Sequence, residues 1–201
     1  MTSLVFKRMI TTAFLLVSLS ACGNILGLPG GGDAPQIFDL KSSYSGSQDI
    51  TNKKVMLLDT IAVSDTLKSN FIVVKPSPQE YSFIKDVLWS EDLPSLIEKY
   101  LVRQYSGPHL VVSSSNFDLK TDYRIRLDVE EFSAIMTGGK VDHVEVSITA
   151  TLFQNTPLKV LKRKNFSQTV NTNDNASDIV SAMNGAMAAL TKDLSDWTAV
   201  Q

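Results

Sequence analysis

Apolar and polar residues alternate most regularly in the second half of the chain, over 123–129 and 144–152. Strict alternation predicts strands that bury one face and expose the other, as in an antiparallel sheet covered on one side. Glycines at 138–139 separate these two segments, and Asn-Thr-Pro at 155–157 precedes a third segment over 158–170. Because such residues are typical of turns between strands, the three segments are expected to form a meander.

The alternation in the first of these strands shifts by one position. Up to Val129 the apolar residues are odd-numbered, whereas Phe132, Ala134 and Met136 are even-numbered. Side chains of a strand point alternately to its two faces, so the shift would turn the apolar set away from the core unless a residue is inserted. A β-bulge is therefore expected at Glu130-Glu131.

A different period, with apolar residues three and four positions apart, follows Trp89. It predicts an amphipathic helix from Leu93, with Asp92 or Ser90 as its N-cap. Pro94 is tolerated in the first helical turn, where its missing donor is not needed. The expected buried face consists of Leu93, Leu96, Ile97, Tyr100, Leu101 and Tyr105.

The same period returns after a polar loop over 171–175 and predicts a final helix with Ser177 as its cap. Its apolar stripe consists of Ile179, Met183, Met187, Leu190, Leu194 and Trp197. The methionines are expected in the core, and contact of these flexible side chains with lipid is the alternative. Small residues beside the stripe are expected to let the helix lie close to the sheet: Ala182, Gly185, Ala186 and Ala189.

Shorter apolar runs in the first half of the chain predict further strands over 37–40, 54–63, 71–74 and 109–112, the second as one strand with an internal bulge. Lys75-Pro76-Ser77-Pro78 is expected to end the third run and to reverse the chain, because proline cannot donate to a ladder. The segment that follows is expected to be irregular. The expected fold class is α+β, with a mostly antiparallel sheet (meander) packed on one face by two amphipathic helices.

The N-terminal stretch follows the pattern of a bacterial export signal, with Lys7-Arg8, an apolar run over 9–19 and small residues before Cys22. Cleavage before a cysteine that carries diacylglycerol would leave a lipid anchor, and two or more acyl chains hold a protein stably at a membrane. An ordinary signal with a chance cysteine is the alternative. We expect a lipoprotein signal peptide over 1–21, a flexible tether over 22–35 and a single domain over 36–201.

Composition narrows the classes of function. Cys22 is the one cysteine, and His109 and His143 are the two histidines, so we expect no internal disulfide, no metal site and no cofactor. Loss of residues 1–21 would change the net charge from −2 to about −4, which argues against a nucleic-acid partner. No second apolar run is long enough to span a bilayer. The residue after the cysteine is Gly23 and not aspartate, which would favour retention in the inner membrane. We therefore expect the outer membrane, with the inner membrane as the alternative.

Three groups of polar residues suggest chemistry, and each also has a structural explanation. Glu91-Asp92 is a carboxylate pair, but acidic residues are common at helix starts. Ser113-Ser114-Ser115 offers hydroxyl nucleophiles and His109 a base, but no G-x-S-x-G motif surrounds them and the serines also fit a turn. Lys162-Arg163-Lys164 would suit lipid headgroups or nucleic acid, but charges on a strand more often protect an exposed sheet edge. No catalytic group is therefore expected.

Several short motifs carry a family resemblance. After the cysteine motif come Phe38-Asp39-Leu40, Ile72-Val73-Val74-Lys75-Pro76-Ser77-Pro78, Trp89-Ser90-Glu91-Asp92-Leu93-Pro94-Ser95-Leu96, Asp122-Tyr123-Arg124-Ile125 and an alanine-rich final helix. In order and spacing, over residues 36–197, they resemble the ABC-type transport auxiliary lipoprotein family. Phe38 stands where the family usually has tyrosine, and Leu88 stands where an arginine often precedes the tryptophan.

The resemblance implies a non-enzymatic accessory protein of transporters with mammalian-cell-entry (MCE) domains, which carry phospholipid or other lipids across the periplasm. Its partners would be an MCE protein with an ABC permease and ATPase, and a homo-oligomer is implied because the family includes ring-forming members. Cys22 would carry the acyl anchor, at the periplasmic side of the outer membrane. Trp89, Tyr81 and Phe83 are the candidate docking or lipid-contacting residues.

Two other functions stay open at this point. One is a structural lipoprotein that assembles an outer-membrane channel, with the same anchor at Cys22. The other is a small periplasmic hydrolase that uses His109 and the serines at 113–115.

Overall fold

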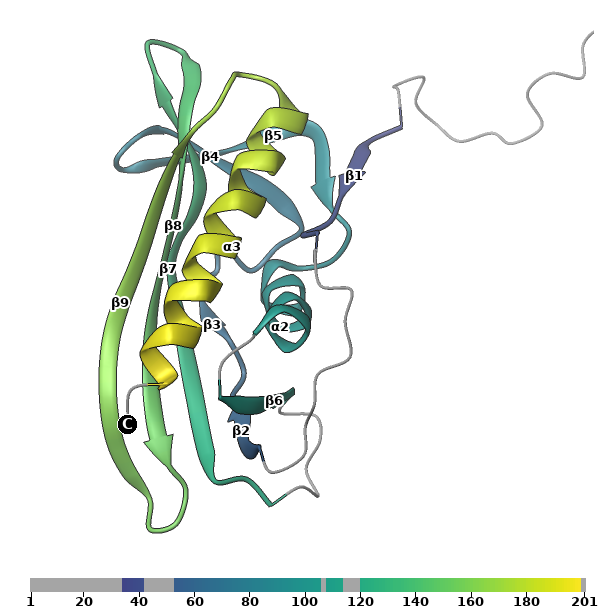
Figure 1. Ribbon diagram of the computed structural model, residues 1–201. Coiled ribbons are helices and arrows are strands. Elements are labelled where there is room, and N and C mark those ends of the chain that lie inside the picture. The colour runs from purple at the N-terminus through teal and green to yellow at the C-terminus, as the bar shows by residue number, and fades with distance from the viewer. Residues whose placement is uncertain (1–33, 42–52, 106–107, 114–119, 200–201) are drawn as a thin grey trace, which may run out of the picture. The chain divides into compact units, whose positions relative to one another are not determined.

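A computed structural model describes residues 34–41, 53–105, 108–113 and 120–199 of the chain (Figure 1). The chain divides into residues 1–34 and a compact unit of residues 35–201. The expected signal peptide, Cys22 and nearly all of the expected tether lie outside the described residues, as does most of the polar loop before residue 53.

The described residues form one nine-stranded sheet and two helices. The helices are α2 (Leu93–Gln104) and α3 (Ala176–Ala199). The strands are β1 (Gln36–Phe38), β2 (Lys54–Leu58), β3 (Ala62–Val63), β4 (Phe71–Ser77), β5 (Glu80–Trp89), β6 (His109–Ser113), β7 (Tyr123–Thr137), β8 (Lys140–Gln154) and β9 (Lys159–Asn171).

Strands β7, β8 and β9 form the expected antiparallel meander. Val129 pairs with Ile148 and Glu131 pairs with Ser147, so Glu130 is the inserted residue and the expected bulge is confirmed. Gly138 and Gly139, with φ of 62° and 81°, form the turn between β7 and β8 in a conformation that favours glycine. The apolar faces of β7 and β8 therefore point to one side, whereas Phe166 is the one buried residue of β9.

The first half of the chain adds parallel pairs, which the sequence patterns do not predict. β7 pairs in parallel with β2, β3 and β4, while β2 also pairs in parallel with β6, and β1 with β5. The longest pairings remain antiparallel, and the α+β fold class is confirmed. β7 is thus the strand on which the two halves of the domain meet.

The strand expected over 54–63 is divided into β2 and β3. Both pair with β7, first Leu58 with Ile125 and then Ala62 with Asp128, so one extra residue is accommodated between them. The backbone N–H of Asp59 still donates to the Ile125 carbonyl, at 2.9 Å. The expected extra residue is present, but it interrupts the strand instead of bulging within it.

Strand β4 is longer than expected, and β5 replaces an expected irregular segment. β4 continues through Lys75 and Pro76 because its pairing with β5 skips from Val74 to Ser77, which leaves no ladder position for the proline to break. The chain reverses at residues 78–79, as expected, and returns as the ten residues of β5.

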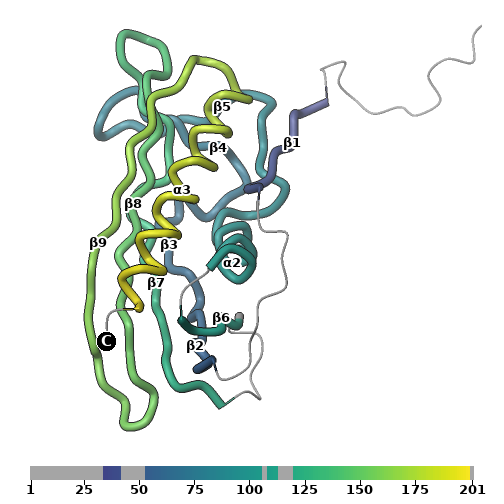
Figure 2. Tube along the Cα trace, in the orientation of Figure 1, coloured from purple at the N-terminus to yellow at the C-terminus, as the bar shows by residue number. Residues whose placement is uncertain are grey.

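Both helices cover the same face of the sheet, with α3 along β8 and β9 and α2 beside β6 (Figure 2). The expected apolar stripes are buried except for the partly buried Trp197, and Met183 and Met187 are fully enclosed in the core. Ala182 and Ala186 face the core, whereas Gly185 and Ala189 are exposed, so the expected close approach through all four small residues is wrong.

The N-caps follow the expectation for one helix and not for the other. Asp92 caps α2, accepting from the backbone N–H of Ser95 at 3.0 Å. The cap of α3 is Asn175, which accepts from the N–H of Asp178 at 2.9 Å, and Ser177 already lies within the helix. The prediction of Ser177 is therefore wrong, because Asn175 offers an equally good acceptor two residues earlier.

Candidate functional site

The three candidate aromatic residues all lie on β5, but they do not form one surface. Trp89 is 2% exposed and meets Phe132 edge-on in the core, with ring centroids 6.0 Å apart. Tyr81 and Phe83 are each 46% exposed. Trp89 is therefore a core residue that holds β5 against β7, and it is removed from the candidate surface.

An irregularity in β5 separates Trp89 from the other two. Phe71 pairs with Leu88 and Val73 pairs with Phe83, so β5 uses more residues than β4 over the same length. Asp86 lies within this stretch at a φ of 56°, a left-handed conformation that is uncommon for a residue with a side chain. Odd-numbered side chains before and after Asp86 consequently face opposite sides of the sheet.

Phe71, Tyr81 and Phe83 are exposed aromatic side chains of the β4–β5 hairpin, and we call these three residues the aromatic patch. Phe71 is 46% exposed, and its ring centroid lies 5.0 Å from that of Phe83. Phe71 was not among the sequence candidates. The sequence feature that could have identified Phe71 is its place in the run over 71–74, where alternation puts its side chain on the strand face opposite that of Ile72.

A lysine–carboxylate pair borders the aromatic patch. Lys75 Nζ lies 2.6 Å from Glu131 Oε2, and 5.2 Å from the centroid of the Tyr81 ring. Glu131 also accepts from the Ser133 hydroxyl at 2.6 Å, and Ser133 is fully buried. The hydrogen bond to Glu131 raises the pKa of Lys75. These contacts hold the β4–β5 hairpin in place on β7.

His143 continues this row of polar residues on β8, since it pairs with Ile135 of β7, which in turn pairs with Lys75. Its Nδ1 lies 2.8 Å from Asp142 Oδ2 and its Nε2 lies 3.3 Å from Glu145 Oε1. The hydrogen bond to Asp142, and then that to Glu145, raises the pKa of His143. The aromatic patch thus has ionic groups along one side, an arrangement that suits protein recognition.

The carboxylate pair and His109, which were considered for catalysis, have structural partners. Asp92 caps α2, and Glu91 forms an ion pair with Lys99. His109 is buried against Tyr123, with ring centroids 4.7 Å apart, and burial lowers the pKa of His109. Ser113 ends β6, and the serines at 114–115 lie outside the described residues.

Two clefts lie on the helix side of the sheet. A cleft of about 230 Å³ separates the β4–β5 hairpin from the start of α3, with Val74, Ile84 and Ile179 in its walls. Another, of about 450 Å³, lies between β1 and α3, where the backbone N–H of Lys41 donates to Asn184 Oδ1 at 2.7 Å. In the described part of the chain, no three His, Cys, Asp or Glu side chains gather in a metal-binding arrangement.

No described helix combines the length and the apolar composition needed to cross a membrane. A search of curated protein sequences found no match.

Solved structures show the same fold at low sequence identity. Protein XCC0632 from Xanthomonas campestris is 18% identical, with a TM-score of 0.71 over 82% of this chain and 95% of its own. An uncharacterised protein, also 18% identical, has a TM-score of 0.65 over 83% of this chain and 99% of its own. The hypothetical protein CT253 from Chlamydia trachomatis is 10% identical, with a TM-score of 0.50 over 73% of this chain and 96% of its own.

The sequence also matches a family model. The match covers residues 38–195, from the end of β1 to the last turns of α3, and so includes nearly the whole described domain. The chain therefore belongs to the family of ABC-type transport auxiliary lipoprotein components.

Proposed function

We propose that this protein is the lipid-anchored accessory component of an MCE/ABC-type lipid transport system, and that it docks the assembly at the outer membrane. The observation that carries the proposal is the family match over residues 38–195, preceded by a lipoprotein signal that ends at Cys22. Acylated Cys22 holds the domain at the periplasmic face of the membrane. Phospholipid is the proposed cargo, and an inner-membrane ATPase supplies the energy.

The role is binding rather than catalysis. The aromatic patch is the proposed contact with the MCE protein, because Phe71, Tyr81 and Phe83 expose apolar area on the β4–β5 hairpin. Aromatic side chains are enriched at protein interfaces, where they contribute large contact areas. Copies of the chain assemble into a homo-oligomer, which would present several such patches to one partner.

A pull-down of the lipoprotein from membranes tests this proposal. Recovery of an MCE protein with its permease is expected, and replacing Tyr81 and Phe83 together by serine should reduce that recovery at least tenfold, as for interface residues worth about 1.4 kcal/mol or more. Val102→Ser, which changes an exposed apolar residue on α2, is the matched control and should leave recovery unchanged. Recovery of an outer-membrane channel without an MCE protein would instead identify an assembly factor and overturn the proposal.

The anchor has its own test. Cys22→Ala should move the protein from the membrane fraction to the soluble periplasmic fraction, because the acyl chains can then no longer be attached. Fractionation of cells followed by detection of the protein measures this. Retention of the Cys22→Ala variant in the outer membrane would show that Cys22 is not the anchor.

A further inference from the structure

The end of the β8–β9 hairpin combines apolar side chains with exposed cations. We call residues 155–161 the hairpin tip. Leu158 is 69% exposed, Val160 is 55% exposed and Leu161 is 36% exposed. The register of β8 against β9 shifts between Leu152 and Phe153, which leaves Leu161 as the extra residue. Three neighbouring aliphatic side chains therefore face solvent at the narrow end of the sheet.

The strand that leads away from the tip is strongly basic. Residues 154–173 contain Lys159, Lys162, Arg163 and Lys164 and no aspartate or glutamate, in a chain whose net charge is −2. Lys162 is partly used within the fold, since its Nζ donates to the Trp197 carbonyl at 2.5 Å and lies 4.8 Å from the Trp197 ring centroid. The side chains of Lys159, Arg163 and Lys164 are exposed.

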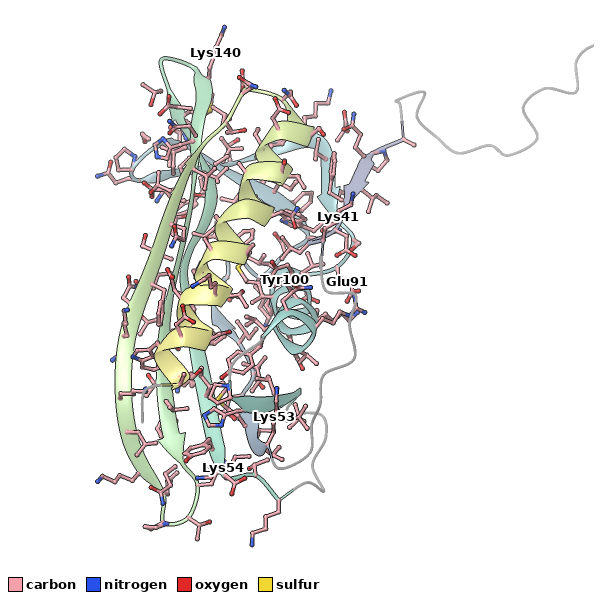
Figure 3. The ribbon with its side chains drawn as sticks, in the orientation of Figure 1. Lys41, Lys53, Lys54, Glu91, Tyr100 and Lys140 are labelled. Atoms are coloured by element: carbon pink, nitrogen blue, oxygen red, sulfur yellow. The ribbon has the colours of Figure 1, made fainter. Side chains whose placement is uncertain are left out.

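Two further lysines lie at the same end of the domain. The backbone N–H of Asn155 donates to the Asp122 carbonyl at 3.0 Å, which fixes the tip beside the start of β7. A cleft of about 320 Å³ there has Lys54 and Lys120 in its walls. Figure 3 shows Lys53 and Lys54 at this end and Lys140 at the opposite end of the sheet. Asp122 also lines this cleft, where its carboxylate accepts from the backbone N–H of Val55, so the apolar tip lies among an excess of positive over negative side chains.

We propose that the hairpin tip binds the surface of an anionic lipid bilayer. Aliphatic side chains at a protruding tip can enter the boundary between headgroups and acyl chains, while neighbouring lysines and arginines reach the negative headgroups. Protection of the β9 edge explains the cations but not the exposed Leu158, Val160 and Leu161. A second copy of the chain would bring like charges together, which is unfavourable.

Contact of the hairpin tip with the membrane would fix the orientation of the domain that the proposed anchor holds there. A tether of thirteen residues spans at most roughly 45 Å, so the expected tether would let Cys22 hold the domain in many orientations. Tyr123 of β7 pairs with Gln154 beside the tip, and Ala134 of β7 pairs with the β4 strand that carries Phe71. At about 3.3 Å per residue, the aromatic patch lies roughly 35 Å from the tip along β7. With the tip on the membrane, the aromatic patch would therefore lie away from the membrane. This orienting role rests on the proposed anchor, whereas the contact of the tip with lipid does not.

An environment-sensitive fluorescent amino acid in place of Leu158 tests the proposal in the full chain reconstituted into vesicles. With phosphatidylethanolamine vesicles that contain phosphatidylglycerol, we expect a blue shift of the emission and quenching by nitroxide-labelled lipid, both reversed by high salt. The same amino acid in place of Lys140, at the other end of β8, should show neither change. A label at 158 that responds equally without phosphatidylglycerol, or not at all, overturns the proposal.

Charge neutralisation provides a second measurement. Each cation near an anionic surface contributes about fivefold to binding, so Lys159→Gln, Arg163→Gln and Lys164→Gln together should weaken the tip–lipid contact on the order of a hundredfold. Lys68→Gln, Lys85→Gln and Lys140→Gln together are the matched control, being exposed lysines elsewhere, and should have little effect.

A fluorescence change that depends on protein concentration without lipid would identify a second copy as the occupant and overturn the proposal. If the label stays unresponsive while Cys22→Ala still releases the protein, the tip contact fails and the anchor stands.

Discussion

Lys75 on β4 and Glu131 on β7 form an ion pair of 2.6 Å in which each side chain is 14% exposed. The pair lies beside the aromatic patch and spans two strands that are far apart in the sequence. Because both groups are largely removed from water, loss of one partner leaves a poorly solvated charge on the other.

Glu131→Gln should therefore lower the free energy of unfolding by about 1–2 kcal/mol, because it removes the charge opposite Lys75 while keeping the side-chain shape. Denaturation in urea measures this. Glu91→Gln is the control, since Glu91 pairs with Lys99 at the surface and such pairs contribute about 0.5 kcal/mol or less. Equal losses for the two variants would contradict a special role for the Lys75–Glu131 pair.

The N-cap of α3 gives a second prediction. Asn175→Ala should cost about 1 kcal/mol of stability, because the N–H of Asp178 then loses its acceptor at the helix start. Ser177→Ala is the matched change two residues later and should be nearly neutral, since its exposed side chain is not the cap. Thermal unfolding of both variants distinguishes the two assignments, and a larger loss for Ser177→Ala would reverse them.

Gly185 is a site for stabilisation. It lies in the interior of α3, is exposed, and a Cβ added there would meet no heavy atom within 4 Å. Gly185→Ala should raise stability by about 0.5–1 kcal/mol, because alanine loses less backbone entropy in a helix.

The neighbouring Ala186 provides the contrast, because it is fully buried against the sheet. Ala186→Leu should destabilise the fold by about 1–3 kcal/mol through overpacking. Chemical denaturation of the two variants measures both effects. A loss of stability in Gly185→Ala would indicate that the exposed face of α3 is covered in the protein.

His143 should make stability depend on pH. Its hydrogen bonds with Asp142 and Glu145 raise its pKa above the ordinary value of 6.5. A raised pKa means that the folded protein favours the protonated form of His143. Its contribution to the free energy of unfolding is therefore complete below about pH 6.5, and it is lost as the pH rises through the pKa in the folded protein. His143→Gln should therefore reduce stability more at about pH 5.5 than at about pH 8.5.

His109 serves as the opposite case for this measurement. Burial lowers its pKa, so its neutral form is favoured in the folded protein and its contribution is lost as the pH falls. Unfolding of His109→Gln and His143→Gln across the same pH range should show opposite trends relative to the unchanged protein. The same trend for both would contradict the assigned environments.

Local patterns determine the elements that bury one face along their whole length. β7 and β8 alternate regularly, and the parity change at Glu130 marks an inserted residue, because one face must stay in the core. The stripe from Leu93 and the acceptor at Asp92 likewise determine α2. Each of these features depends on residues that are close together in the sequence.

The structure of β5 depends on the strands with which it pairs. Tyr81 and Phe83 are half-exposed, so the segment lacks the alternation of a buried strand. It nevertheless forms a strand, because it pairs with β4 and β1. The irregularity at Asp86 then turns Trp89 into the core and leaves Tyr81 and Phe83 outside. A sequence pattern cannot show which of three nearby aromatics faces solvent when the backbone changes face between them.

The sequence by itself determined the meander, the two helices, the α+β class and the family resemblance, because these depend on periodicity and short motifs. Tertiary structure alone decided the parallel pairs around β7, the aromatic patch that includes Phe71, and the exposure of the apolar tip residues with Lys54 and Lys120 at the same end of the domain. The physical reason is that strand pairing joins residues far apart in the sequence, so the side chains gathered on each surface follow from register and not from local order.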